Sequence, residues 1–146
     1  MKPVRLFLTI CCLLFLSGLG ACTSPELLDT GQSISIARID DKTYVTSDGE
    51  KLAMSAWQAR APEAVYVAVH GFNEYAADFR LPAPWFAERG ISVYGYDQRG
   101  FGRTPDSRRG KWAGGDVMAS DLTTFVRLIR QRHPGLPVHV VGTSMG

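Results

Sequence analysis

A serine stands between two glycines in the sequence Gly142-Thr143-Ser144-Met145-Gly146. A serine hydroxyl becomes a useful nucleophile when a base removes its proton and a sharp turn of the backbone exposes it. The two glycines, Gly142 and Gly146, suit such a turn, because side chains at those positions would collide with the flanking backbone. We therefore predict that Ser144 is a catalytic nucleophile. A glycine- and serine-rich turn after a strand is the structural alternative.

Attack by Ser144 on a carbonyl group would place negative charge on the carbonyl oxygen. The backbone N–H of the following residue, Met145, is aimed at that oxygen in such a turn. Residues 137–141, directly upstream, are apolar and rich in β-branched side chains, which predicts a buried parallel strand. The sequence thus predicts a strand that leads into a tight turn carrying Ser144.

A second apolar run, residues 64–69, continues directly into His70-Gly71-Phe72. The run predicts another buried strand. Gly71 allows the backbone to bend close to a bound molecule. His70 is expected to brace this loop by hydrogen bonding rather than to act as a base.

A third apolar run, residues 91–96, leads into a polar turn with glycines two positions apart. Asp97 begins this turn. We expect its carboxylate to hold the loop by accepting hydrogen bonds from backbone N–H groups or from Arg99.

The three motifs, in this order and spacing, resemble those of the α/β-hydrolase superfamily. They are a strand followed by HGF-N-E, a strand followed by YD-x-RG-x-G-x-T, and a strand followed by GTSMG. Within the superfamily, the sequence is most similar to monoacylglycerol lipase/lysophospholipase-like serine hydrolases, a group often described together with serine aminopeptidases. The resemblance covers residues 42–146, which correspond to the N-terminal half of that fold.

The resemblance implies roles for several residues. In this fold the N–H of Phe72 would form the oxyanion hole together with Met145, with His70, Gly71 and Asp97 supporting the loops. The fold places the catalytic acid and histidine after the serine in the chain, which argues against Asp97 as that acid. Both partners are thus expected beyond Gly146, and the chain as written is expected to be a truncated and inactive piece of such an enzyme.

The N-terminus has the pattern of a bacterial lipoprotein signal. Lys2 and Arg5 precede a short apolar run, residues 6–16, and small residues lead up to Cys22. The run is too short for a permanent membrane span, which needs about 20 residues. We expect cleavage before Cys22 and lipid on that cysteine, which would anchor the protein to a membrane of the bacterial cell envelope. An ordinary secretory signal is the alternative.

The composition narrows the range of partners. Loss of Lys2 and Arg5 with the signal lowers the 16 basic residues to 14, which equals the 14 acidic residues, so binding to nucleic acid is not expected. Cys11 and Cys12 would leave with the signal, so no disulfide framework or metal-binding cysteine cluster is expected. No cofactor or metal is predicted, and the sequence does not indicate an oligomeric state.

Basic residues gather in the loop after residue 98. They are Arg99, Arg103, Arg108, Arg109 and Lys111. A solvated loop is one interpretation, and contact with anionic head groups or with a phosphate-bearing substrate is the other.

The chain is expected to contain a signal peptide at residues 1–21, a tether at 22–32 and the hydrolase half-domain at 33–146. Strands alternate with helices, which predicts a mostly parallel, doubly wound α/β sheet. The further elements expected are strands at 33–39, 42–46 and 51–58, a helix at 81–89, and a helix capped by Asp116 that ends before Pro134.

Three functions are compatible with this sequence. The first is a serine esterase acting on monoacylglycerol- or lysophospholipid-like substrates through an acyl-enzyme on Ser144. The second is a lipid-anchored domain that binds without catalysis. The third keeps the fold but acts as an amidase, aminopeptidase or acyltransferase.

Overall fold

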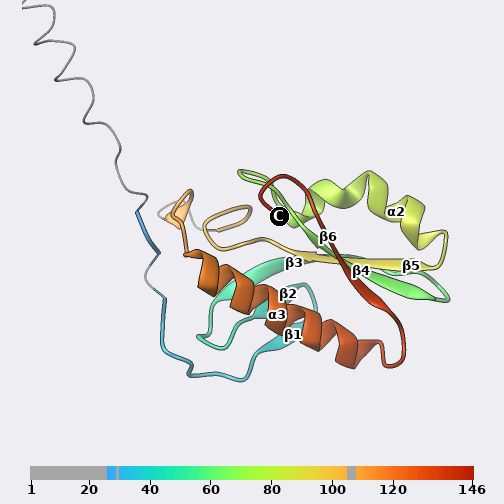
Figure 1. Ribbon diagram of the computed structural model, residues 1–146, viewed down its shortest axis with the longest axis horizontal. Helices are drawn as coiled ribbons and strands as arrows, with labels where there is room; N and C mark the ends of the chain where they lie inside the picture. The colour runs from blue at the N-terminus through green and yellow to red at the C-terminus, as the bar shows by residue number, and fades with distance from the viewer. Residues whose placement is uncertain (1–25, 29, 105–107) are drawn as a thin grey trace, which may run out of the picture.

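The computed structural model describes residues 26–28, 30–104 and 108–146 (Figure 1). The predicted signal peptide and Cys22 lie outside the described residues. No helix in the described part of the chain is long and apolar enough to cross a membrane.

The fold is built on a six-stranded mixed sheet with the strand order β1-β2-β3-β5-β4-β6. The strands are β1 (Arg38–Asp40), β2 (Thr43–Val45), β3 (Lys51–Trp57), β4 (Ala64–Val69), β5 (Ile91–Tyr96) and β6 (Val138–Gly142). β1, β2 and β3 pair antiparallel, and β3 pairs antiparallel with β5. β4 pairs parallel with β5 on one side and with β6 on the other. The three parallel strands are those that lead into the three sequence motifs.

Helices lie on both faces of the sheet, as the doubly wound prediction requires (Figure 1). One face carries α2 (Pro82–Ala87), which follows the short 3₁₀ helix η2 (Ala76–Arg80). The opposite face carries the long helix α3 (Gly115–Arg132). The doubly wound α/β arrangement predicted from the sequence is confirmed.

The core under α3 is aromatic and aliphatic. Phe125 of α3 is fully buried, and its ring lies 5.1 Å from Tyr44 and 4.8 Å from Tyr96, measured between ring centroids. Ile129 lies one turn further along the same side of α3 and is also fully buried. These contacts attach α3 to β2, in the antiparallel part of the sheet, and to β5, in the parallel part.

The core under α2 is smaller. Ala83 packs against Ala68 of β4 and Val93 of β5, and Phe86 makes an edge-on ring contact with Tyr66. Trp85, on the same helix, is 54% exposed and stacks against the guanidinium of Arg89.

Several element boundaries differ from the sequence predictions. α3 begins at Gly115 with Gly114 as its N-cap, so Asp116 lies in the first turn and is not the cap. The first strand covers Arg38–Asp40 and not residues 33–39. The backbone N–H groups of Ile34 and Ser35 both donate to the carbonyl of Ser47, in the turn between β2 and β3, and form no strand ladder.

The burial of β6 also differs from its prediction. This strand was expected to be buried on both faces, but Val140 is 50% exposed because β6 lies at the edge of the described sheet. β4, which lies between β5 and β6, is buried as expected.

Candidate active site

Ser144 occupies a tight turn directly after β6. The N–H of Gly146 donates to the carbonyl of Thr143 at 2.8 Å, which makes Ser144 the first central residue of the turn. Its φ is +53°, a left-handed conformation that non-glycine residues rarely adopt. The side chain of Ser144 is exposed, as a nucleophile that attacks a bound carbonyl group must be.

The two glycines of the motif are needed on steric grounds. A Cβ atom on Gly142 would lie 2.3 Å from the backbone of Gly146, and one on Gly146 would lie 2.3 Å from the carbonyl oxygen of Val69. The turn also bonds to β4, because the N–H of Thr143 donates to the carbonyl of Val69 at 3.1 Å. The turn is therefore folded tightly onto the end of β4.

The loop after β4 lies directly against this turn. A Cβ atom on Gly71 would lie 3.1 Å from the Cβ of Ser144 and 3.2 Å from the carbonyl oxygen of Thr143. The absence of a side chain at Gly71 thus lets the loop pack against the serine turn. Phe72, the next residue, is 65% exposed, and its ring contacts Phe101 edge-on at 5.4 Å.

Glu74 connects this loop to the serine turn. Its Oε2 atom accepts the backbone N–H of Gly71 at 2.7 Å and the hydroxyl of Thr143 at 3.2 Å. Sequence reasoning used Glu74 only as part of the motif and gave it no role. Its position three residues after Gly71 is the signal that could have indicated a loop-closing hydrogen bond.

His70 is fully buried and bonded on both sides of its ring. Its Nε2 accepts the backbone N–H of Gln98 at 2.8 Å, so its Nδ1 carries the proton that is donated to the carbonyl of Gly71, also at 2.8 Å. The side chain of Gln98 donates to the carbonyl of His70 at 2.6 Å. Hydrogen bonds of His70 thus connect the loops after β4 and β5.

Asp97 lies at the end of β5 and is 2% exposed. Its carboxylate accepts the backbone N–H groups of Ala76 and Arg103, each at 2.9 Å, and the Nε of Arg103 at 2.9 Å. The expected backbone bonds are present. The guanidinium that it binds is that of Arg103 and not that of Arg99, because Arg99 is turned toward two other carboxylates.

Those carboxylates belong to Asp48 in the hairpin turn and Asp121 in α3. Arg99 reaches Asp48 Oδ2 at 2.6 Å and Asp121 Oδ2 at 2.6 Å, and all three side chains are at most 10% exposed. The hydrogen bonds from Arg99 lower the pKa of Asp48 from 3.8 to about 2. Burial raises the pKa of Asp121, against the effect of the same guanidinium.

Four of the basic side chains in the loop after residue 98 form ion pairs within the chain. Arg103 and Arg99 pair with the aspartates just described, Arg108 pairs with Glu50 at 2.6 Å, and Lys111 pairs with Glu26 at 2.6 Å. These four cations connect the loop to other segments of the chain.

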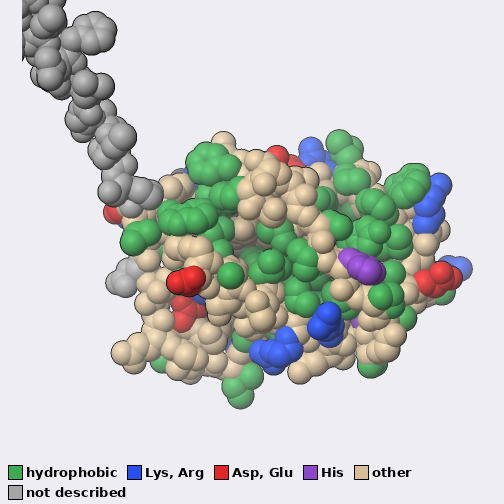
Figure 2. Space-filling model, in the orientation of Figure 1, with side chains coloured by type: hydrophobic (Ala, Val, Ile, Leu, Met, Phe, Trp, Pro, Cys, Tyr) green, Lys and Arg blue, Asp and Glu red, His purple; other side chains and the backbone are tan. Residues whose placement is uncertain are grey.

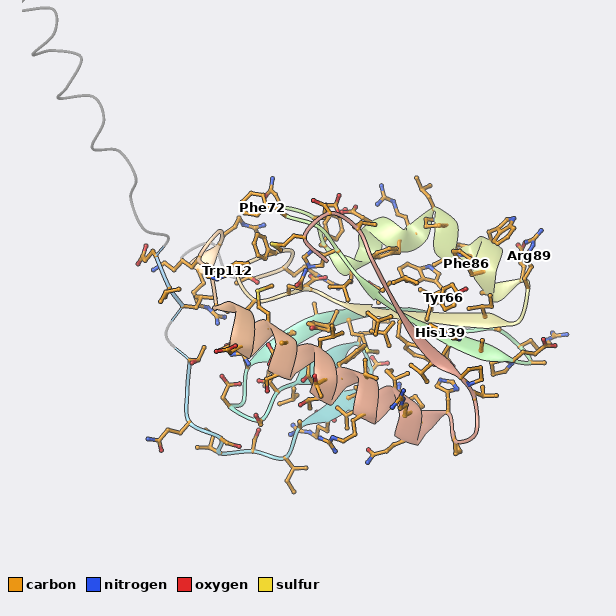
Figure 3. The ribbon with its side chains drawn as sticks, viewed as in Figure 1. Tyr66, Phe72, Phe86, Arg89, Trp112 and His139 are labelled. Carbon is orange, nitrogen blue, oxygen red and sulfur yellow. The ribbon has the colours of Figure 1, made fainter. Side chains whose placement is uncertain are left out.

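The two histidines near β6 make structural contacts. His133 follows α3 and bonds to the hydroxyl of Tyr94 at 2.8 Å, and burial lowers its pKa. His139 lies within β6 and meets the ring of Tyr66 edge-on (Figure 3).

Met145 completes the turn and lines a pocket of 230 Å³ between the sheet and α3, together with Val69, Tyr96 and Trp112. The structure therefore brings the predicted residues of the HGF loop and of the serine turn to one place, at the carboxyl ends of β4 and β6. Asp97 stands one strand away, at the carboxyl end of β5.

This arrangement agrees with the comparisons to known proteins. Residues 60–146 match the family described as "Serine aminopeptidase, S33". The match covers more than half of the chain, and the chain belongs to this family of α/β-hydrolases.

Curated relatives include monoacylglycerol and monoglyceride lipases. The chain is 32% identical over 107 residues to the monoacylglycerol lipase of Mycolicibacterium smegmatis, covering 73% of this chain and 38% of that protein. It is 28% identical over 120 residues to the human monoglyceride lipase, covering 77% and 37%. The chain thus spans less than two-fifths of the length of these relatives.

Solved structures give the same result. A soluble variant of the monoglyceride lipase from Saccharomyces cerevisiae, in complex with a substrate analogue, matches with a TM-score of 0.59 and 26% identity, covering 86% of this chain and 38% of that one. A carboxyl esterase from Bacillus coagulans, in complex with glycerol, also has a TM-score of 0.59 and 26% identity, covering 82% and 38%.

Proposed function

We propose that this chain belongs to a serine esterase that hydrolyses monoacylglycerol- or lysophospholipid-like esters through an acyl-enzyme on Ser144. The observation that carries the proposal is the left-handed turn at Ser144, packed against Gly71 of the neighbouring loop. Such a turn stores backbone strain that a purely structural serine does not require. The lipase names of the relatives support the substrate class.

In the proposed reaction, the Oγ of Ser144 bonds to the ester carbonyl carbon, and its proton passes to a histidine that the family's chain order places after the serine. The N–H groups of Phe72 and Met145 bind the oxyanion. Collapse of the tetrahedral intermediate breaks the ester C–O bond, and the departing alcohol takes the proton. Water then repeats the attack and releases the carboxylic acid. Loss of one oxyanion donor typically costs about 2.7–4 kcal/mol of transition-state stabilisation.

We further propose that lipid on Cys22 holds the enzyme at a membrane of the bacterial cell envelope. The support is the sequence pattern of residues 1–22 alone. A lipid anchor suits the proposed substrates, since an enzyme at the bilayer surface meets monoacylglycerols and lysolipids where they reside.

The family description favours amide hydrolysis as a second candidate. Both reactions use the same nucleophile and oxyanion donors, so nothing in the described site separates them. Turnover of monoacylglycerol and short-chain esters, compared with aminoacyl amides, decides between them.

The test of the catalytic proposal uses a fluorophosphonate probe on the full-length membrane protein. We expect labelling that is lost in Ser144→Ala and retained in Ser120→Ala, a change of a serine in α3 outside the site. Equal labelling of the wild type and Ser144→Ala would exclude Ser144 as the nucleophile. Absence of labelling in both would favour a binding domain without catalysis.

A further inference from the structure

The expected tether does not run freely from the proposed anchor to the domain. Within it, Leu27 forms a parallel bridge with Trp112, in the loop before α3. The N–H of Leu28 donates to the carbonyl of Trp112 at 2.7 Å, and the N–H of Trp112 donates to the carbonyl of Glu26 at 3.1 Å. The carboxylate of Glu26 also pairs with Lys111 at 2.6 Å. We call residues 26–28 the strap.

The strap attaches beside the candidate active site. Trp112, to which it binds, lines one pocket together with Met145 and Gly146 of the serine turn. Figure 3 shows Trp112 and Phe72 at the same end of the molecule, which is also the end where the described chain begins in Figure 1.

The surface that carries the strap and Phe72 is held together by backbone and ring contacts. Gly110, in the Trp112 loop, donates its N–H to the carbonyl of Gly100 at 2.7 Å. Phe101, which follows Gly100 in the chain, contacts the ring of Phe72 edge-on. Leu27 is 64% exposed and Phe72 is 65% exposed, so a large apolar side chain projects from each end of this surface. Figure 2 shows hydrophobic side chains at this end of the molecule, as over the rest of the face in view.

The length of chain between Cys22 and the strap limits how far this surface can lie from an anchored lipid. Glu26 lies four positions after Cys22 in the sequence. A fully extended chain spans at most about 3.3–3.6 Å per residue, so the two residues lie within about 14 Å of each other. The head-group layer of a bilayer is itself roughly 5–8 Å thick on each side.

We propose that the strap orients the mouth of the active site toward the membrane that holds the Cys22 lipid, with Phe72 and Leu27 in contact with the lipid surface. This inference rests on the lipidation in the proposed function and adds the orientation. A lipid anchor alone holds a protein near a bilayer, whereas an anchor joined to a docked strap also fixes which face is presented. An ester in the bilayer would then reach Ser144 without first entering bulk water.

The first test uses the full-length lipidated protein on phosphatidylcholine vesicles that contain monooleoylglycerol. Leu28→Pro removes the N–H that donates to Trp112, and Leu28→Ala, the matched control, keeps it. We expect both variants to remain on the vesicles and to hydrolyse a water-soluble short-chain ester equally. On vesicle-borne monooleoylglycerol, Leu28→Pro should be slower than Leu28→Ala by roughly fivefold, the factor that one backbone hydrogen bond contributes to an equilibrium.

The possible failures are distinguishable. Equal rates of the two variants on monooleoylglycerol would overturn the strap proposal while leaving the esterase intact. Release of the unmodified protein from vesicles would overturn both the lipid anchor and the orientation that rests on it. Absence of turnover of the soluble ester would count against the proposed esterase, and the orientation would then be decided by the second test.

The second test measures orientation without activity. Among residues 22–146, Cys22 is the one native cysteine and its sulfur would carry lipid, so a single introduced thiol can be labelled with an environment-sensitive fluorophore. We expect quenching by nitroxide-labelled lipids for the label in Phe72→Cys. The label in Ile36→Cys, an exposed site in the segment before β1, should be quenched much less. Similar quenching at both sites, or stronger quenching at residue 36, would contradict the proposal.

Discussion

The side chain of Glu74 connects the two halves of the candidate site, which are the loop after β4 and the serine turn. One carboxylate oxygen receives the Gly71 N–H from the loop after β4 and the Thr143 hydroxyl from the serine turn. The backbone of Phe72 directly follows Gly71, so the position of the proposed oxyanion donor depends on this carboxylate. Glu74 is thus a positioning residue.

We expect Glu74→Ala to lower kcat for a soluble ester by about tenfold with little change in KM, because it leaves the Gly71 N–H without its acceptor. Glu74→Gln keeps a carbonyl oxygen and should restore part of the rate. Glu88→Ala, which removes an exposed carboxylate after α2, is the control. Steady-state kinetics of the full-length variants provide the measurement, and an unchanged kcat in Glu74→Ala would show that the loops hold their positions without it.

The glycines of the serine turn give a second prediction for single residues. Gly146→Ala places a methyl group against the Val69 carbonyl, which belongs to the rigid strand β4. Overpacking of this kind typically costs about 1–3 kcal/mol. We expect the variant to lose fluorophosphonate labelling of Ser144. Gly115→Ala, in the open first turn of α3, should label normally, since no atom lies within 4 Å of the added methyl group.

Among the elements, α3 provides most of the packing on its face of the sheet. Phe125 fills the space between Tyr44 of β2 and Tyr96 of β5, so a single side chain joins the antiparallel and parallel parts of the sheet. The parallel part carries the serine turn. Stability of the site therefore depends on a helix that contributes no predicted catalytic group.

Phe125→Ala should lower the free energy of unfolding of the full-length protein by about 3–5 kcal/mol, the usual cost of removing a buried aromatic ring. Thr123→Ala, an exposed change in the same helix, should stay within about 0.5 kcal/mol of wild type. Urea denaturation followed by tryptophan fluorescence measures both. A loss below about 1 kcal/mol in Phe125→Ala would mean that the surrounding rings close the cavity.

At the scale of the whole molecule, Arg99 joins three segments that are distant in the sequence. The hairpin turn supplies Asp48, the loop after β5 supplies Arg99, and α3 supplies Asp121. The carboxylates share one guanidinium in a nearly buried site, so removal of the cation would leave two anions without a partner.

The lowered pKa of Asp48 predicts a pH dependence of stability. A carboxyl with a folded-state pKa of about 2 against 3.8 when unfolded stabilises the fold fully above about pH 4, and the effect disappears as the pH falls toward 2. We expect Asp48→Asn to cost about 1–2 kcal/mol at pH 7. The difference from wild type should shrink between pH 4 and 2. Burial, the largest cause of the raised pKa of Asp121, is the same in both proteins. The part of that shift caused by the charge of Asp48 is removed in Asp48→Asn and offsets some of the difference at pH 7.

Urea midpoints of wild type and Asp48→Asn, measured from pH 7 down to the lowest pH at which both fold, test this prediction. Asp40→Asn, at an exposed ion pair, is the control and should show no such trend. A difference between wild type and Asp48→Asn that stays constant with pH would show that Asp48 does not titrate as expected.

The sequence alone was sufficient for the two strands that lead into the HGF loop and the Asp97 turn. The apolar runs at residues 64–69 and 91–96 became β4 and β5 with the expected bounds, because buried parallel strands need uninterrupted apolar residues. The strands expected at residues 42–46 and 51–58 became β2 and β3, joined by a turn with Gly49 at a φ of +84°. Such features are local, since the backbone conformation that each requires is encoded in neighbouring residues.

Tertiary structure decided what the side chains of the motifs contact. Arg99 lies two residues from Asp97, yet it binds Asp48 and Asp121, because strand order and the position of α3 determine which carboxylates surround it. Glu74 gained its role only when β6 paired beside β4 and brought Thr143 within reach. The strap could not be foreseen either, since the bridge between Leu27 and Trp112 is a backbone contact across 85 residues of sequence and leaves no pattern in side-chain type. The sequence by itself determined the chemistry that is available and the local turns that expose it, and the folded chain decided which distant groups hold that chemistry in place.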